Sequence, residues 1–332
     1  MAAKTPILLL AGALAVLVIV GWQQGWVGHN YLQSPPAPLG RQGSIIVTPE
    51  PTDSTSPLAL PDPVALLTAA TKAHRGRLSV SATLLVGINL FGEQARAEGD
   101  YLEESPLVSQ RFRVDLDFRH KAQTATFRQV CDGRIFQTYT KLGNDEGTLV
   151  SLDLVRIGHS VAKRVREFAT EPAPSWWPSM GGIGRILSEL NRIFQFDSVT
   201  PWRINEVPVW RLEGRWEPSW LGRMMPQQEA AIKQGKPADL RKLPIHVPDH
   251  IVLFLGRQDM FPYRLECWRT GNGRSTEGAE GDSVLQIYLQ FGNVRINQPV
   301  NPARFIYRPA NMKATDQTEL FLRGRGLTVE EE

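Results

Sequence analysis

The stretch LSVSATLLVGINL, residues 78–90, decides the fold. Its even positions are all apolar, and most of its odd positions are small or polar; the even set is Leu78, Val80, Ala82, Leu84, Val86, Ile88 and Leu90. Because side chains of a strand alternate between two faces, the pattern predicts one strand with an apolar face and a polar face. At about 3.4 Å per residue this strand would be roughly 40 Å long, which is typical of large curved sheets and barrels. The stretch therefore indicates a concave apolar surface.

The chain begins with an uncharged apolar run, PILLLAGALAVLVIVGW at residues 6–22. A helix of this length spans about 26 Å, near the lower limit for a bilayer core. Lys4 precedes the run, and only His29 follows it before Arg41, so we expect residues 1–5 in the cytoplasm and the remainder exported. We expect residues 6–22 to be an uncleaved transmembrane anchor. A cleaved signal segment is the alternative.

The rest of the chain divides by composition. Residues 23–61 are rich in proline, which predicts an extended linker. Residues 62–322 contain no second linker and predict one domain, and residues 323–332 form a polar tail.

The expected order of elements within the domain is a helix, a run of strands, two helices and further strands. Asp62 and Pro63 begin the first helix, Phe91-Gly92 is a turn, and Asp132-Gly133 is typical of a tight hairpin. The strands are expected at 78–90, 94–102, 111–119, 124–130, 134–140, 207–217, 250–257, 263–270 and 284–296. We expect the second helix at 154–168, capped by Ser151, and the third after Ser179, at 183–194. This order argues against a parallel βαβ repeat and predicts a mainly β (α+β) fold, an antiparallel sheet curled over a few helices.

The search for catalytic and metal-binding patterns is negative. His246 and His250 have a metal-like spacing, but Pro248 prevents the helix that would bring them together. The net charge of +3 is spread along the chain and gives no reason to expect nucleic acid. We therefore predict no enzyme activity, no cofactor and no metal. Cys131 and Cys267 could form a disulfide in an exported domain or remain two packed thiols.

Three short motifs carry a resemblance to a known family. They are Gln110-Arg111-Phe112-Arg113-Val114 after Pro106, Val130-Cys131-Asp132-Gly133-Arg134, and LQIYLQFGNVRINQPVNPARFIYRP, in which Asn293, Asn297, Phe305, Tyr307 and Pro309 stand at the matching places. Together with the element order over 62–322, they resemble the LolA family of periplasmic outer-membrane lipoprotein carriers and related lipid-binding envelope proteins.

The resemblance implies an incomplete antiparallel β-barrel of about eleven strands, closed by helices, whose concave cavity holds acyl chains. It also implies a periplasmic domain, here tethered to the inner membrane by a single pass, or soluble if the segment is cleaved. Two features depart from the carriers. Glu103, Glu104 and Ser105 stand where the family has a gating arginine, and a retained anchor would prevent shuttling between membranes.

The candidate ligand-binding residues are the apolar faces of three expected strands: Val80, Ala82, Leu84, Val86, Phe112, Val114, Leu116, Phe118, Leu285, Ile287, Leu289 and Phe291. The alternative is that these faces are core, packed against the helices at 154–168 and 183–194. Trp220, Met224 and Met225, beside a short helix expected at 227–234, could form a lid or a packed connection. Arg156, Lys163, Arg164 and Arg166 give one helix a basic face, which could approach anionic headgroups or simply be solvated.

These observations favour a membrane-tethered envelope protein that binds lipid or the acyl chains of a lipoprotein, with a role in carriage, hand-off or sensing. The alternative is a protein of the same fold that binds no ligand and serves as a regulatory or structural partner of other envelope proteins.

Overall fold

The computed structural model describes residues 47–49, 60–104, 111–121, 123–167, 182–270, 283–310 and 312–327. Within them, one sheet of thirteen strands has the order β1-β8-β9-β10-β11-β12-β2-β3-β4-β5-β6-β7-β13. The strands are β1 (Val47–Pro49), β2 (Ser79–Leu90), β3 (Glu93–Glu104), β4 (Arg111–His120), β5 (Gln123–Cys131), β6 (Ile135–Leu142), β7 (Thr148–Asp153), β8 (Phe194–Ile204), β9 (Val207–Trp216), β10 (His250–Gly256), β11 (Pro262–Thr270), β12 (Ser283–Ile296) and β13 (Thr315–Asp316). Neighbouring strands are antiparallel except β7 and β13, and the sheet does not close on itself.

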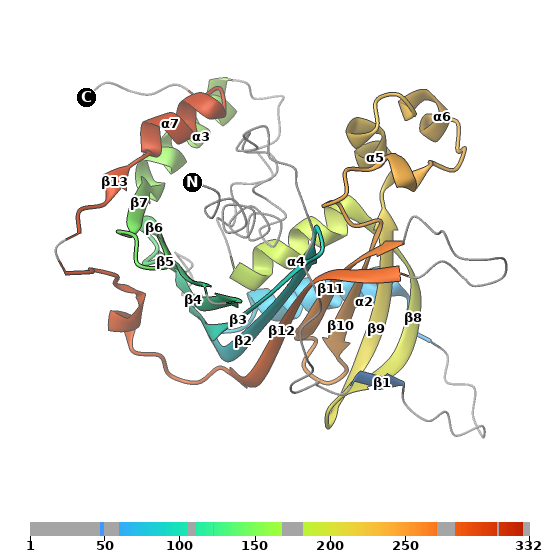
Figure 1. The fold of residues 1–332 in the computed structure, drawn as a ribbon, viewed down its shortest axis with the longest axis horizontal. Coiled ribbons are helices and arrows are strands. Elements are labelled where there is room, and N and C mark those ends of the chain that lie inside the picture. Colours follow the sequence, from blue (N-terminus) through green and yellow to red (C-terminus); the bar gives the residue numbers. More distant parts are fainter. Residues whose placement is uncertain are drawn as a thin grey trace.

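The helices of the described residues lie at three places around this sheet (Figure 1). They are α2 (Pro63–Arg75), α3 (Leu154–Glu167), α4 (Gly182–Ile193), α5 (Pro218–Met224), α6 (Glu229–Lys233) and α7 (Thr318–Gly324), with short 3₁₀ helices η2 (Leu240–Lys242) and η3 (Pro302–Phe305). The sheet curves around α2 and α4, α3 pairs with α7 near β7, and α5 and α6 project from the opposite end of the sheet. We call the face toward α2 and α4 the inner face, and the other the outer face.

The first helix and the long strand form as predicted. Asp62 caps α2, because its Oδ2 accepts a hydrogen bond from the backbone N–H of Ala65 at 2.7 Å. β2 pairs with β3 along its whole length, and the turn between them places Phe91 and Gly92 at φ 57° and 76°. These are the positive values that a two-residue hairpin turn requires.

The second predicted helix begins differently from our expectation. Ser151 does not cap α3, because it lies within β7, a strand that the sequence did not indicate. The cap is Asp153, whose Oδ1 accepts hydrogen bonds from the N–H groups of Val155 (2.9 Å) and Arg156 (3.1 Å). β8 was also missed. It follows α4 without a loop, Ile193 ending the helix and Phe194 beginning the strand.

The carboxy-terminal part of the chain crosses the outer face of the sheet. The guanidinium of Arg113 on β4 donates to the carbonyl of Arg304 at 2.9 Å, and the rings of Tyr139 on β6 and Tyr307 lie 5.8 Å apart. The chain then pairs with β7 as β13 and forms α7. α7 packs on α3 through a small core of Ile157, Val161, Leu322 and Leu327.

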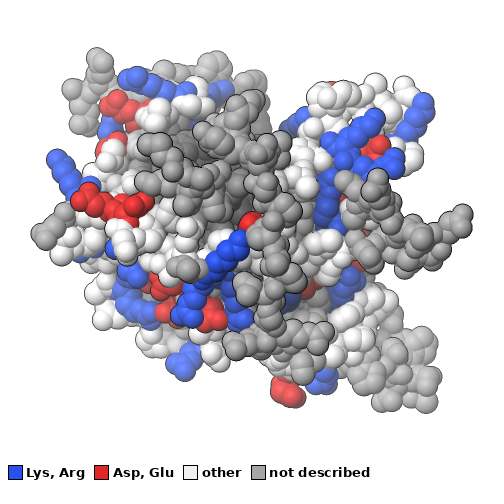
Figure 2. Space-filling model, in the orientation of Figure 1, with Lys and Arg blue, Asp and Glu red and all other residues white. Residues whose placement is uncertain are grey.

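The amino-terminal anchor predicted at 6–22 lies outside the described residues. None of the helices in the described ranges is long and apolar enough to cross a bilayer. Within the linker predicted at 23–61, Val47–Pro49 form β1, which pairs with the end of β8. Basic and acidic side chains lie interspersed over much of the face shown in Figure 2, in keeping with the small net charge.

Candidate functional site

Most of the candidate residues on β2 and β12 belong to the main core. These are Val80, Ala82, Leu84, Val86, Ile287, Leu289 and Phe291, all buried and in one cluster with residues of α2 and α4. Gly184 of α4 lies so close to α2 that an added Cβ would be 3.0 Å from the ring of His74. These seven residues therefore pack in the core, as the alternative interpretation of the sequence expects.

Leu285 does not share the face predicted for it. A register shift between β11 and β12 pairs Ile287 with Cys267 but Leu285 with Trp268. The extra residue, Gln286, reverses the alternation, so Leu285 lies on the outer face with Trp268. The prediction was wrong because strict alternation cannot anticipate a bulge.

The candidate residues on β4 lie at the border of the core. Leu116 and Phe118 are buried in it, and Phe112 is buried beside Phe136 of β6, with ring centroids 5.9 Å apart. Val114, between them, is only half-buried. The inner face therefore becomes more accessible from β4 onward.

A half-buried inner surface continues from Val114 across β5 and β6. The registers pair Val114 with Gln129, Gln129 with Thr138, Leu116 with Phe127, and Ala125 with Leu142. We define the inner patch as Val114, Phe127, Gln129, Thr138 and Leu142, all half-buried and all on the inner face. Four of these five residues were not candidates, because polar residues interrupt the apolar pattern of both strands.

A chain of buried polar contacts ties the start of α4 to the border between β3 and β4. The Glu103 carboxylate lies 3.0 Å from Nε2 of His74 on α2 and accepts a hydrogen bond from the Tyr101 hydroxyl. That hydroxyl in turn accepts a hydrogen bond from the backbone N–H of Ile183 at 2.9 Å. Burial and the adjacent Glu103 carboxylate raise the pKa of Tyr101 well above its usual value. The carboxylate thus joins both helices to the sheet.

Arg77 extends this series of buried polar contacts. Its Nη1 lies 3.4 Å from Nδ1 of His74, and its Nη2 donates to the carbonyl of Asp259. Because Arg77 can only donate, His74 accepts at Nδ1 and donates from Nε2, the tautomer that also suits Glu103. Burial lowers the pKa of Arg77, and its Cζ lies 5.3 Å from the ring centroid of Phe261.

The possible lid residues belong to an insertion between β9 and β10, residues 217–249. Met225 is buried in a small separate core with Leu221, and Met224 packs against the same cluster. Trp220 is half-buried between two guanidiniums, with the Cζ atoms of Arg192 and Arg223 at 4.5 and 4.7 Å from its ring. Met225 therefore contributes to packing within the insertion, and Trp220 connects the insertion to α4.

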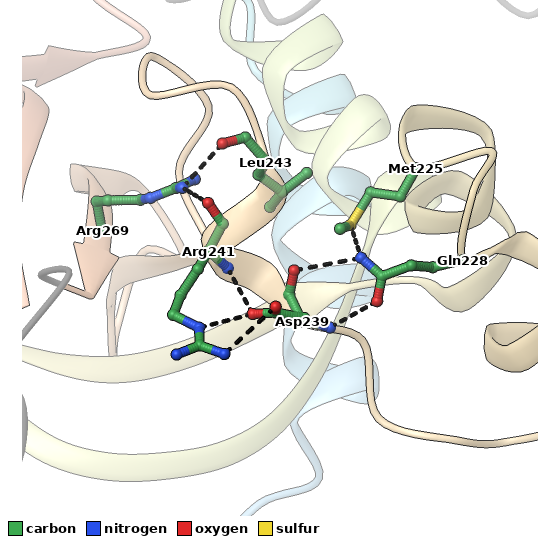
Figure 3. A network of polar contacts seen from close by, with 6 residues as sticks. All are labelled: Met225, Gln228, Asp239, Arg241, Leu243 and Arg269. Carbon is green, nitrogen blue, oxygen red and sulfur yellow. Dashed lines mark hydrogen bonds and ion pairs between the residues drawn. The ribbon is translucent and has the colours of Figure 1, made fainter.

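Arg269 at the end of β11 holds the second half of the insertion (Figure 3). Its Nη2 donates to the carbonyls of Leu243 (2.9 Å) and Arg241 (3.4 Å), and its Nη1 donates to the carbonyl of Val247 at 2.8 Å. A buried guanidinium surrounded by carbonyl oxygens fixes a loop that has little regular structure of its own.

The two cysteines are buried thiols, so the possible disulfide between Cys131 and Cys267 is not formed. Cys131 lies on β5 and Cys267 on β11, with β12, β2, β3 and β4 between them. Five strand spacings amount to roughly 24 Å along the sheet, whereas a disulfide requires Cα atoms within about 7 Å. Burial raises the pKa of Cys131 to about 11 and that of Cys267 to about 12.

No metal-binding group of three or more His, Cys, Asp or Glu side chains occurs in the part of the chain that the structure describes. His250 and Asp249 form a pair with their atoms 2.5 Å apart, and Asp249 also accepts a hydrogen bond from the N–H of Thr270 at 2.6 Å. Hydrogen bonds from His250 and Thr270 outweigh burial and lower the pKa of Asp249. These contacts hold the first residue of β10 and the residue before it in place.

Comparisons with known proteins give a weak likeness. No family model matches the sequence, and no curated protein matches it. Among solved structures, the chain is similar to MucB in complex with MucA(peri), at 13% identity and a TM-score of 0.35, over 74% of this chain and 60% of that one.

Two further structures are similar over most of their own length. A DUF1329 family protein from Desulfovibrio piger is 10% identical at a TM-score of 0.30, over 74% of this chain and 98% of the other. A putative outer membrane lipoprotein-sorting protein domain from Vibrio parahaemolyticus is 9% identical at 0.28, over 73% and 95%. All these TM-scores lie below 0.5, so the likeness carries no argument about what this chain binds.

Proposed function

We propose that this protein binds an acyl chain, of a lipid or of an acylated lipoprotein, against the inner patch. The observation that carries the proposal is the half-buried apolar surface of Val114, Phe127 and Leu142, which continues an otherwise fully packed inner face. Each CH₂ group removed from water contributes about 0.8 kcal/mol, so burial of even part of one acyl chain would contribute several kcal/mol to binding.

The polar members of the patch suit such a ligand as well. Gln129 and Thr138 lie beside Val114 in the register, so the surface is too polar for a dry core of its own. An amphipathic ligand can bury its chain on the apolar members and leave its polar end near the amide and hydroxyl groups. We further propose that the domain acts in the periplasm, tethered by residues 6–22, in carriage, hand-off or sensing of lipoproteins, and that it is not an enzyme.

A test compares two neighbouring residues of β6 that face opposite sides of the sheet. Thr138 lies in the inner patch, and Gln137 on the outer face is half-buried to a similar degree. Native mass spectrometry of the full chain, purified in a mild detergent, should detect co-purified acyl ligands. Thr138→Trp should remove most of the bound ligand by filling its place, and Gln137→Trp should retain it. Equal retention by both variants would contradict the proposal.

A second function is favoured by one specific observation. Nine of the twelve candidate lining residues are packed in the main core, as expected for a relative that serves as a regulatory or structural partner of other envelope proteins. In that case the full chain carries no acyl ligand and still forms a complex with an envelope protein after chemical crosslinking in cells.

A further inference from the structure

Three large apolar side chains are exposed at one end of the sheet. They are Phe91 in the turn between β2 and β3, Ile245 in the insertion, and Val284 near the start of β12, of which 39%, 59% and 42% is exposed. β2 ends and β12 begins at this end, because the two strands are antiparallel and Ile88 pairs with Ile287. We call Phe91, Ile245 and Val284 the rim patch.

Contacts between their segments place these three residues close together. The ring centroid of Phe91 lies 6.5 Å from that of His246, the residue after Ile245. The side-chain amide of Gln286 donates to the carbonyl of Ile245 at 2.6 Å. Gln286 is two residues after Val284 on β12. An isolated exposed apolar side chain needs no explanation, whereas a group of them marks an interaction site.

The loop that carries Ile245 is held on both sides of that residue (Figure 3). The buried guanidinium of Arg269 donates to the carbonyl of Leu243 at 2.9 Å and to that of Val247 at 2.8 Å. The side chains of Leu243 and Val247 are themselves buried in the small core of the insertion. Ile245 therefore projects into solvent from a loop that is fixed before and after it.

Phe91 is exposed at a cost to the backbone. Its φ of 57° lies in the left-handed region, which asparagine, aspartate and glycine adopt far more readily than an aromatic residue. Any of those three would make this turn with less strain and leave a polar surface. Backbone strain of this kind is concentrated at functional sites. The strain therefore favours a role for the exposed ring in binding.

The expected anchor at 6–22 would bring a bilayer within reach of the rim patch. Residues 23–46 join that run to β1, which pairs with β8 at the opposite end of the sheet. At about 3.1 Å per residue, an extended proline-rich chain of this length reaches roughly 75 Å, which exceeds the roughly 40 Å length of the strands. The chain is thus long enough for the rim patch to face the membrane. Its side chains project from turns and loops, a form that suits insertion among lipid headgroups.

We propose that the rim patch inserts into the interfacial layer of a lipid bilayer, so that this end of the sheet faces the membrane. The inference does not depend on acyl binding at the inner patch. Residues 271–282, which join β11 to β12 at this end and lie outside the described residues, carry one arginine and three acidic residues. Attachment therefore depends on the apolar side chains and should persist on neutral lipid.

The experiment measures which end of the domain contacts lipid. The full chain, reconstituted into phosphatidylcholine vesicles, carries an NBD fluorophore at Ile245→Cys or at Leu78→Cys. Leu78 is the matched control, because 68% of it is exposed and it lies about 40 Å away, beyond the other end of β2. Emission from Ile245→Cys should shift to shorter wavelength and be quenched by spin-labelled lipid. Quenching should be strongest with the spin label near the headgroups, as for insertion to about 5–10 Å. Emission from Leu78→Cys should show neither effect.

A second substitution removes part of the rim patch without changing the labelled position. Phe91→Asp should abolish most of the quenching at Ile245→Cys, because a carboxylate resists transfer out of water. Aspartate suits the backbone of this turn, so the variant should fold. Leu78→Asp is its control and should leave the quenching unchanged. The unaltered chain, treated in the same way, measures any labelling of the buried Cys131 and Cys267.

Three outcomes would overturn the proposal. The first is equal quenching at the two labelled positions, or none at either. The second is quenching on anionic vesicles alone, which would show attachment by charge. The third is a label at Ile245→Cys that is shielded from aqueous iodide and not quenched by lipid, which would show that a protein partner or a second copy covers the patch. Acyl binding is measured separately by native mass spectrometry, so it stands or fails independently.

Discussion

The two halves of the sheet bury their inner faces in different ways. From β8 through β12 to β3, inner side chains pack on α2 and α4, whose Leu67, Leu187 and Leu190 are completely buried. From β4 to β7, the inner face includes half-buried residues such as Val114 and Phe127. The inner face of the first half is fully packed, whereas part of the inner face of the second half remains accessible.

The reason for the difference lies in side-chain chemistry. Inner positions of β2 and β12 are aliphatic or aromatic, so the apolar faces of α2 and α4 can cover them without leaving a polar side chain of these strands unpaired. Inner positions of β5 and β6 include Gln129 and Thr138, which need hydrogen-bond partners. A curved sheet can thus combine a fully packed core with an accessible surface in one layer.

The largest effect is expected at the border between the halves. Glu103→Ala removes the acceptor for Tyr101 and His74, leaving both buried groups without this partner. Breaking a buried charged contact costs about 3–5 kcal/mol, so the free energy of unfolding in urea should fall by that amount.

The neighbouring Glu104 is the control. It pairs with Arg111 at 3.2 Å, and both side chains remain partly exposed. Glu104→Ala should lower the free energy of unfolding by less than about 1 kcal/mol, as exposed ion pairs do. Equal losses of unfolding free energy for the two variants would mean that the buried polar contacts of Glu103 do not hold the helices in place.

A second prediction compares packing in the two halves. Leu187→Ala, in the filled half, should cost about 3 kcal/mol, because it opens a cavity between α4 and the sheet. Val114→Ala, in the inner patch, should cost about 1 kcal/mol, since part of the side chain is already accessible. Urea unfolding of both variants measures the contrast. A loss at Val114 as large as that at Leu187 would show that the second half is as tightly packed as the first.

Much of this architecture was predictable from local patterns. The alternation at 78–90 predicted β2, and Asp62 with Pro63 predicted the start of α2, because each signal depends on a few adjacent residues. The face of Leu285 was not predictable, because it depends on a β-bulge. A bulge is defined by how β11 pairs with β12, and no local sequence pattern shows that pairing. β8 was missed because it follows α4 with no turn residue to mark the change.

The candidate site was predictable only in part. Val114 was found from alternation, whereas Phe127 and Leu142 stand in strands whose inner positions are partly polar. The contacts of Glu103 with His74 and Tyr101, and of Tyr101 with Ile183, join α2, β3 and α4, and no spacing of residues in the sequence predicts them.

The smallest effect should appear in the reactivity of the two thiols, one in each half. The thiolate is the reactive form, and burial raises the pKa of Cys131 to about 11 and of Cys267 to about 12. At pH 8 both are protonated, so both should react slowly in the native protein and rapidly in urea. Burial raises the pKa of Cys131 less than that of Cys267, so Cys131 has the larger thiolate fraction, and β5 belongs to the half with the accessible inner face.

Maleimide labelling of the single-cysteine variants Cys131→Ser and Cys267→Ser, followed by mass spectrometry, measures each rate. The native rate at Cys131 should exceed that at Cys267, and both should rise about tenfold per pH unit between pH 8 and 10, because each pKa lies above this range. If Cys267 reacted first, the half covered by α2 and α4 would be the one that opens, and the contrast between the halves would be reversed. Equal native rates would mean that both thiols react through unfolding of the whole sheet.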